Sequence, residues 1–299
     1  MTDFWLPVAL VTAFSSATGD TIVKAKFSHF SSGDMSIVRV MSPLPFLIPI
    51  LLYIPWPETD AVFWQTIIIV LPFEILALLL YMKAIKSSPL SLTIPFLAFT
   101  PMFIVLTGWL VLGERLSLEG ILGISLTVTG AYILNFSQTT FGLLAPFKAI
   151  FREKGSRLML MVAAIYSLTS VLGKKAIIHS EPVFFACFYL VILGVLTPLA
   201  IFFRTKLSGD KRSVFAFLKH KDKGMWKGFW GVGLAQAVMV LTHMWAISLA
   251  PAAYMIAVKR TSLLFSVFYG KIIFKETETL QRMLGAVIML LGVAVIAYQ

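Results

Sequence analysis

Two stretches of this chain decide its fold: VLGERLSLEGILGISLTVTGAYIL at Val111–Leu134 and IIFKETETLQRMLGAVIMLLGVAVIA at Ile272–Ala297. They belong to a longer internal match, in which a shift of 162 residues lays Tyr81–Leu134 over His243–Ile296 without a gap and leaves 13 of 54 positions identical. Because the matched segments are strongly apolar, one hydrophobic unit has been used twice. In membranes, two such halves commonly enclose a central cavity. The repeat therefore predicts a transporter.

The composition is that of a membrane protein. Apolar residues make up 59% of the chain, charged residues only 13%, and the mean hydropathy is +0.90. A soluble chain carries about 25% charged residues, and a helix needs about 20 apolar residues to cross a bilayer. Ten such stretches are present, at residues 4–26, 35–54, 61–82, 87–111, 117–137, 157–178, 182–203, 228–249, 251–273 and 279–298. We predict an all-α integral membrane protein with ten transmembrane helices and no room for a soluble catalytic domain.

The charge distribution predicts the orientation of these helices. The net charge is +11; 19 Lys and Arg residues flank the loops after odd-numbered helices, and the opposite face has only Arg115, Lys174 and Lys175. Basic loops stay in the cytoplasm, so both termini are expected outside. Five helices per half is an odd number, so the second half enters the membrane from the other side and the repeats are inverted. We predict a first five-helix repeat at 1–137, an interfacial or ordinary linker at 138–156, and a second repeat at 157–299.

The two repeated stretches resemble the signature of the EamA-type drug/metabolite transporter superfamily. Its pattern is an apolar helix that ends in Gly-Glu, a short polar turn, and a helix with glycines seven apart. Here the acids are Glu114 and Glu276, although Lys275 replaces the glycine before the second, and the glycine pairs are Gly123/Gly130 and Gly285/Gly292. Glycines seven apart lie on one helix face and allow a neighbouring backbone to approach. Each acid is expected to meet the positive dipole of the following helix.

The resemblance covers essentially the whole chain. Arg39 matches an arginine found in the second helix of many members, while Lys24 and Lys175 match the basic residue that often ends the first helix of each half. It implies a ten-helix transporter but leaves the substrate open, because the superfamily handles amino acids, sugars, nucleotide sugars, phosphorylated metabolites and toxic cations. The ten-helix relatives are understood to keep both termini in the cytoplasm, against the orientation that the charges predict here.

Ionisable residues inside the predicted spans indicate a function, because each costs at least about 2.5–3.5 kcal/mol at the bilayer centre. The repeat register pairs Glu74 with Gln236, and Tyr81 with His243, on the third and eighth helices. Two polar side chains seven residues apart share one helix face. Both faces are therefore expected to flank one cavity between the halves. For Tyr81 and His243, anchoring at the membrane interface is the alternative.

The two halves differ most at Lys259 and Arg260, where the same register places Leu97 and Ala98 in the first half. One cation is expected to face the cavity and the other, about 100° around the helix, to turn toward Glu74 or Asp20. The pair resembles the one on the ninth helix of sugar-phosphate/phosphate translocators, which implies that it binds a phosphate or carboxylate. Arginine offers a bidentate fork and lysine a point charge for such a group. A purely structural buried ion pair is the alternative.

Three further charged residues lie near the ends of the first two predicted spans. Asp20 and Lys24 stand four residues apart on the first helix, the spacing of an intrahelical ion pair. Arg39 lies five residues into the second span, from which it either extends toward the membrane surface or binds substrate. We assign Asp20 and Lys24, with Glu74, to ion coupling or charge balance.

No catalytic or metal-binding motif is present in the sequence. The four histidines are scattered, Cys187 is the only cysteine, and there is no HExxH motif and no glycine-rich phosphate loop. No catalytic residue, metal ion, cofactor or nucleic-acid partner is therefore expected. An intramembrane enzyme that uses Glu74 and His243 as an acid–base pair stays a remote alternative.

The resulting hypothesis is a secondary active transporter that moves a small organic anion, phosphorylated or carboxylate, by alternating access around a site at the membrane midplane. Lys259, Arg260, His243, Tyr81, Arg39 and Gln236 would bind it. The alternative is proton-coupled export of amino acids, amines or drugs, with Glu74 or Asp20 as the titrating carboxylate. The expected partners are the small-molecule substrate and the lipid bilayer, with a homodimer left open. A bacterial or archaeal inner membrane is the expected location.

Overall fold

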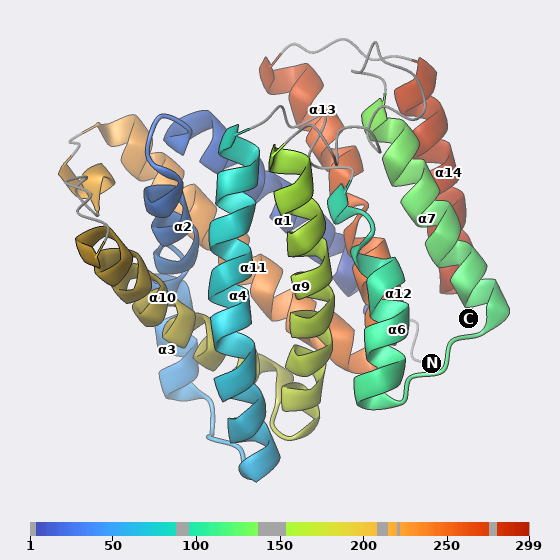
Figure 1. Cartoon of the computed structure of the whole chain (residues 1–299), viewed down its shortest axis with the longest axis horizontal. Helices are drawn as coiled ribbons and strands as arrows, with labels where there is room; N and C mark the ends of the chain where they lie inside the picture. Colours follow the sequence, from blue (N-terminus) through green and yellow to red (C-terminus); the bar gives the residue numbers. More distant parts are fainter. Residues whose placement is uncertain are drawn as a thin grey trace.

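The computed structural model describes residues 4–87, 96–136, 154–207, 215–219, 222–274 and 280–298, and these form helices with no strand among them (Figure 1). The first half contains α1 (Trp5–Phe27), α2 (Ser32–Met41), α3 (Leu44–Tyr53), α4 (Ala61–Ser87), α6 (Thr100–Leu112) and α7 (Leu118–Phe136). The second half contains α9 (Lys154–Ile178), α10 (Pro182–Leu207), α11 (Lys223–Leu249), α12 (Ala252–Lys259), α13 (Ser262–Phe274) and α14 (Leu280–Ala297), with a short 3₁₀ helix at Ala216–Lys219.

The helices have the lengths and composition of membrane spans. Within the described residues, six candidates are long and apolar enough to cross a bilayer: Trp5–Phe27, Ser32–Tyr53, Ala61–Ala84, Lys154–Ile178, Pro182–Leu207 and Lys223–Leu249. Three shorter apolar helices accompany them, at Thr100–Leu112, Leu118–Leu134 and Arg282–Ala297. The protein is therefore an integral, multi-pass, all-helical membrane protein. Ten as the exact number of spans stays a prediction, and residues 88–95 of the predicted fourth span lie outside the described residues.

Two predicted spans are broken rather than continuous. The span predicted at 35–54 divides between α2 and α3, because Pro43 has no N–H with which to continue the helical ladder. The span predicted at 251–273 divides between α12 and α13 at Arg260 and Thr261, where no proline is present. There the Thr261 hydroxyl donates to the Val258 carbonyl at 2.8 Å, and this local bond bends the chain away from regular helix.

The break before α13 has a counterpart at the same register in the first half. Phe99 N–H donates to Phe96 O at 3.2 Å, and Thr261 N–H donates to Val258 O at 2.9 Å; both donor and acceptor are related by the shift of 162 residues. A hydroxyl reinforces each turn, since Thr100 Oγ1 donates to Leu97 O at 2.7 Å. The two halves thus share a helix break as well as a sequence pattern.

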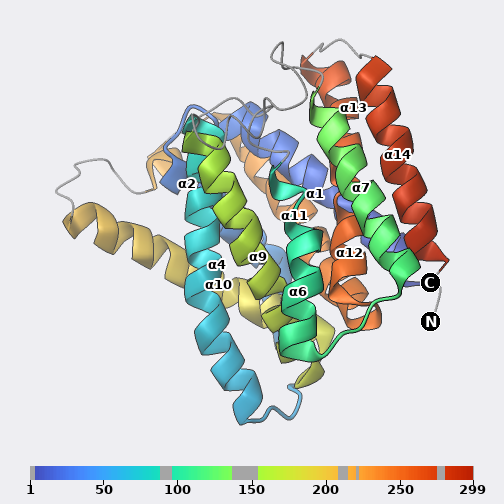
Figure 2. The same ribbon diagram turned by 45° about the vertical axis from the view of Figure 1, so that its right-hand side comes forward.

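The predicted glycine packing surfaces are confirmed, and they pack against each other. Helices α7 and α14, one from each half, lie side by side (Figures 1 and 2). A Cβ on Gly130 would lie 2.3 Å from the Met289 backbone nitrogen, and a Cβ on Gly285 would lie 2.3 Å from that of Leu134. Only glycine permits so close a backbone approach. This contact joins the two halves at one side of the bundle.

The two termini lie at one end of the bundle, which we call the terminal end (Figures 1 and 2). Since α1 starts there and α14 finishes there, the C-terminal end of α1 and the first turn of α14 mark the opposite end, which we call the far end. Between them, α1 packs against α11 and α4 against α9, so each of these contacts also joins the first half to the second.

Candidate functional site: a charged cavity between the two halves

A cavity of about 870 Å³ lies between the halves and is walled by residues from nearly every long helix. All nine residues singled out from the sequence line it: Asp20, Lys24, Arg39, Glu74, Tyr81, Gln236, His243, Lys259 and Arg260. The wall reaches the far end at Ser28, the C-cap of α1, and at Arg282 of α14. In the other direction it reaches Gly173 of α9 and Ile247 of α11, near the terminal end. The nine predicted residues therefore lie around one cavity, where they can contact the same bound molecule.

The helix break positions Lys259 and Arg260. Lys259 is the last residue of α12 and Arg260 is its C-cap, so both cations lie at the negative end of that helix dipole. Both line the cavity, and so do the two carboxylates, Asp20 and Glu74, that were expected to attract one of them. Arg260 Nε is buried with no hydrogen-bond partner among the described residues. The pair therefore presents positive charge and an unused donor.

Arg39 forms an ion pair that the sequence did not reveal. Its guanidinium donates to the Asp20 carboxylate, which joins α2 to α1, and its Cζ lies 5.7 Å from the centre of the Tyr81 ring. The side chain of Arg39 is only 14% exposed, so it does not extend to the membrane surface. Spacing had suggested Lys24, one turn away, as the partner of Asp20. A residue on another helix holds that carboxylate instead, and Lys24 lines the cavity beside it.

Glu74 and its repeat mate Gln236 occupy opposite halves of the same wall. Glu74 belongs to α4, and Thr169 of α9 lies within electrostatic range of its carboxyl group. Among the described residues, Glu74 belongs to none of the ion pairs, which are Asp20–Arg39, Glu114–Lys174 and Asp60–His179. Gln236 is buried on α11 against α1. The carboxyl group is thus available inside the cavity.

His243 and Tyr81, which the repeat register pairs, also line the cavity, one from each half of the chain. His243 is buried on α11, and its Nδ1 has no hydrogen-bond partner among the described residues. Lys259 and Arg260 both lie within electrostatic range of its ring. Tyr81 is half-buried on α4 beneath Arg39. Both side chains therefore lie in the cavity wall, as the repeat register had predicted.

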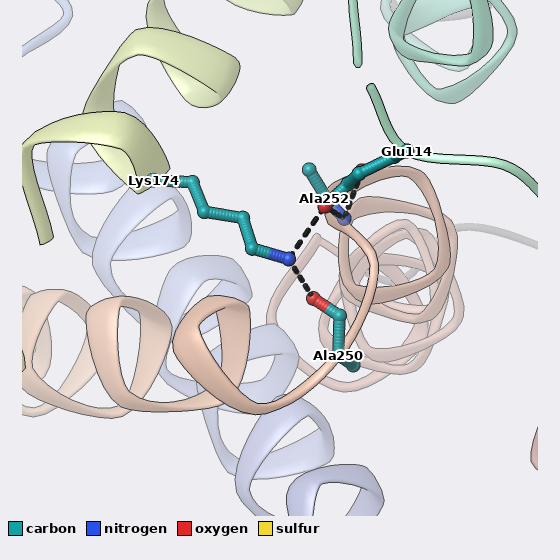
Figure 3. Close-up of polar contacts among 4 residues, drawn as sticks. All are labelled: Glu114, Lys174, Ala250 and Ala252. Carbon is teal, nitrogen blue, oxygen red and sulfur yellow. Dashed lines mark hydrogen bonds and ion pairs between the residues drawn. The ribbon is translucent and has the colours of Figure 1, made fainter. Parts of the chain in front are cut away.

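A compact polar contact lies just beyond the cavity at the terminal end (Figure 3). Lys174 Nζ donates to Glu114 Oε1 at 2.5 Å and to the Ala250 carbonyl at 2.6 Å, while the Ala252 N–H donates to Glu114 Oε2 at 3.0 Å. We call these four residues the Glu114 cluster. The helix whose positive end Glu114 meets is α12, not α7 as its sequence position had suggested. Its repeat mate Glu276 lies outside the described residues.

Several wall residues were missed at the sequence level. Tyr189, Thr169 and Arg282 all line the cavity. The repeat register pairs Tyr189 with apolar Phe27 and Thr169 with Pro7, so comparing the two halves did not mark these positions as polar in both. Tyr166 also lines the cavity.

Comparison with known proteins identifies the family. The sequence profile of the EamA-like transporter family matches residues 3–136 and 153–298, so each half of the chain matches it once. The chain therefore belongs to the EamA-like transporter family. It is a membrane transporter of small molecules, built from two inverted repeats, and this family consists of transporters rather than enzymes.

One solved crystal structure shares the fold with a TM-score of 0.71 over 97% of this chain and 94% of the other, at 13% sequence identity. At this low sequence identity, the structural similarity supports the fold and gives no information about the substrate. No curated protein matches the chain. None of these matches shows the resemblance of Lys259 and Arg260 to the sugar-phosphate translocators.

Proposed function

We propose that this protein is a secondary active transporter of a small organic anion, phosphorylated or carboxylate, which binds in the cavity between the halves. The observation that carries the proposal is the charge of the wall. In this wall three cations, Arg39, Lys259 and Arg260, face two carboxylates, Asp20 and Glu74, which leaves an excess of one positive charge among these groups. Charge inside a membrane is costly, and an anionic substrate offsets this excess.

Two buried polar atoms without partners in the wall support the same substrate class. Arg260 Nε and His243 Nδ1 are buried without partners among the described residues, and leaving such groups unsatisfied costs about 1–3 kcal/mol each. A phosphate or carboxylate supplies several acceptor oxygens, for which arginine is a bidentate partner and lysine a point charge. In this proposal Lys259 and Arg260 hold the charged group, His243, Gln236 and Tyr81 orient the molecule, and the Asp20–Arg39 pair shapes the wall.

Transport would proceed by alternating access. The Glu114 cluster bridges α6, α9 and α12 at the terminal end, beyond Gly173 and Ile247, and would keep that end closed while substrate enters from the far end. The matched breaks at Ala98–Phe99 and Arg260–Thr261 would let each half bend at the level of the site. The repeats 1–137 and 157–299, joined by a linker at 138–156, would rock around the site. This motion would close the far end of the cavity and open the terminal end.

The basic loops favour an orientation in which the far end faces the cytoplasm and both termini face outside. A bacterial or archaeal inner membrane is the proposed location, and a homodimer is the oligomer to test first. Reporter fusions at each terminus check the orientation: signal from a periplasm-active reporter supports it, and signal from a cytoplasm-active reporter overturns it.

A thermal-shift panel on the purified protein tests the substrate class. Phosphorylated and carboxylate metabolites should raise the midpoint of unfolding, and cationic amines of similar size should not. Lys259→Gln and Arg260→Gln should each lose the shift, whereas Lys206→Gln, which removes the same charge from an exposed position on α10, should keep it. Stabilisation by amines alone would reject an anion carrier.

The second candidate is proton-coupled export of a cationic compound, and Glu74 is the observation in its favour. A carboxyl group inside the membrane, outside every ion pair of the described residues, can exchange a proton for a cationic substrate. Glu74→Gln would then remove the dependence of transport on a pH gradient. Retention of that dependence in both Glu74→Gln and Asp20→Asn would exclude this mechanism.

A further inference from the structure

The wall around Glu74 carries several hydroxyl groups. Thr169 and Tyr166 of α9 and Tyr189 of α10 lie within electrostatic range of the Glu74 carboxyl group. All four residues line the cavity. None of the cavity cations forms an ion pair with Glu74 among the described residues. Lys259 and Arg39 lie within electrostatic range of Glu74 without contacting it, so its carboxyl group and the nearby hydroxyl oxygens can approach a bound cation.

Tyr189 contributes an independent observation in this region. Its side chain is only 6% exposed, and its hydroxyl has no hydrogen-bond partner among the described residues. A buried hydroxyl without a partner costs about 1–3 kcal/mol. Because Tyr189 lines the cavity, a polar group of a bound molecule is in a position to satisfy it.

The same region offers an aromatic surface. The rings of Phe185 and Tyr189 stack with centroids 5.0 Å apart and an interplanar angle of 16°, and both residues line the cavity. The face of an aromatic ring attracts cations, and it does so most strongly where water is excluded. Carboxylate, hydroxyls and ring faces together define a site for an ammonium group.

The acidic and basic regions belong to one cavity and lie within electrostatic range of each other. Glu74 interacts with Lys259 at a distance longer than an ion pair, so the two charges attract without being in contact. A substrate with negative charge alone would be repelled by Glu74 when it binds Lys259 and Arg260. A molecule with an anionic group and an ammonium group satisfies both regions at once.

We propose that the cavity has two subsites and that the substrate is a small zwitterion: Lys259 and Arg260 hold its phosphate or carboxylate, and Glu74, Tyr166 and Tyr189 hold its ammonium group. This inference rests on the proposed function, to which it adds a second charged group on the substrate. It also assigns Tyr189, which the sequence did not single out, as a specificity-determining residue.

Matched ligand pairs test the proposal on the full-length protein in detergent. O-Phosphoethanolamine and ethyl phosphate differ essentially by one ammonium group, and so do β-alanine and propionate. Titration calorimetry should show that the ammonium member binds at least about tenfold more tightly in the pair whose anionic group the site accepts. In Glu74→Gln the ratio of the two affinities should fall to about one, while binding of the simple anion is retained.

Tyr189→Phe keeps the ring and removes the unpartnered hydroxyl, so it should lower the affinity ratio by a smaller factor in a protein that folds normally. Tyr53→Phe, at an exposed position, should leave the ratio unchanged. Equal affinities within each pair in the wild-type protein, or an unchanged ratio in both Glu74→Gln and Tyr189→Phe, would overturn the second subsite and leave the anion carrier standing. Failure of all four ligands to bind the wild-type protein would overturn both.

Discussion

Removal of Glu114 should open the terminal end of the cavity. In Glu114→Ala the Lys174 ammonium keeps only the Ala250 carbonyl as a partner, and the Ala252 N–H at the start of α12 loses its acceptor. In Lys174→Met the carboxylate keeps the Ala252 N–H and the positive end of the α12 dipole. Glu114→Ala should therefore have the larger effect of the two.

The burial of the Lys174–Glu114 ion pair determines how much free energy Glu114→Ala should cost the closed state. The side chains of Lys174 and Glu114 are 12% and 15% exposed. Removing one partner of a fully buried pair costs about 3–5 kcal/mol, and an exposed pair contributes at most about 1 kcal/mol, so we expect about 2 kcal/mol for Glu114→Ala. Since about 1.4 kcal/mol is a factor of ten in an equilibrium constant, the open population at this end should rise roughly 30-fold.

Thiol labelling measures this change directly. The single native thiol, Cys187, is buried and can be replaced by serine, after which Ile247→Cys places one thiol in the cavity wall near the cluster. A membrane-impermeant maleimide, added from the side on which the termini lie, should label this thiol roughly 30-fold faster in Glu114→Ala. Glu119→Ala removes the same charge from an exposed position on α7 and should leave the rate unchanged.

A double-mutant cycle decides whether the two residues act together. The combined variant Glu114→Ala/Lys174→Met removes both charges, so its effect should be smaller than the sum of the single effects by about 1–3 kcal/mol. Strictly additive effects, or an unchanged labelling rate in Glu114→Ala, would refute the conclusion that the Glu114 cluster closes this end.

Two further predictions concern stability. Gly130→Val should lower the midpoint of thermal unfolding sharply, because its Cβ would lie 2.3 Å from the Met289 backbone nitrogen. Gly173→Ala, whose Cβ would have its nearest contact at 3.7 Å, should change the midpoint little. Similar midpoints for the two variants would argue against the α7–α14 contact. Asp60, in the loop before α4, accepts from the Phe63 N–H at 2.9 Å and faces His179 Nδ1 at 2.8 Å, and these contacts lower the pKa of its carboxyl group below the usual 3.8. A lowered pKa stabilises the folded state at neutral pH, and this stabilisation is lost as the pH falls through the lowered value, so the difference between wild type and Asp60→Asn should narrow in acid. A difference that stays constant on acidification would contradict this assignment.

The helices were predictable because a membrane span requires a long apolar stretch, and such stretches can be identified directly in the sequence. The span predicted at 4–26 corresponds to α1, Trp5–Phe27, and that predicted at 157–178 to α9, Lys154–Ile178. The glycine packing surfaces of α7 and α14 were also predictable, because glycines seven residues apart lie on one helix face, but the sequence did not predict that these two surfaces meet. Repeat register then placed Glu74, Gln236, Tyr81 and His243 on related faces, and these faces line one cavity.

What the sequence could not predict depends on contacts between distant helices. Asp20 pairs with Arg39, because the packing of α1 on α2 brings this guanidinium to the carboxylate. Glu114 binds the start of α12, which follows it by 138 residues. The break at Thr261 was hidden because a broken span and a continuous one have the same apolar composition. Tyr189 has an apolar repeat mate, so symmetry left it unmarked.

Uptake into proteoliposomes tests the central claim most directly. The anion that stabilises the purified protein best should enter vesicles that contain the wild-type protein or Lys206→Gln, in a saturable manner. Vesicles that contain the folded variant Lys259→Gln/Arg260→Gln should show only the leak of protein-free vesicles. Equal saturable uptake by this double variant and the wild type would contradict a carrier whose binding site depends on the cations beside the helix break.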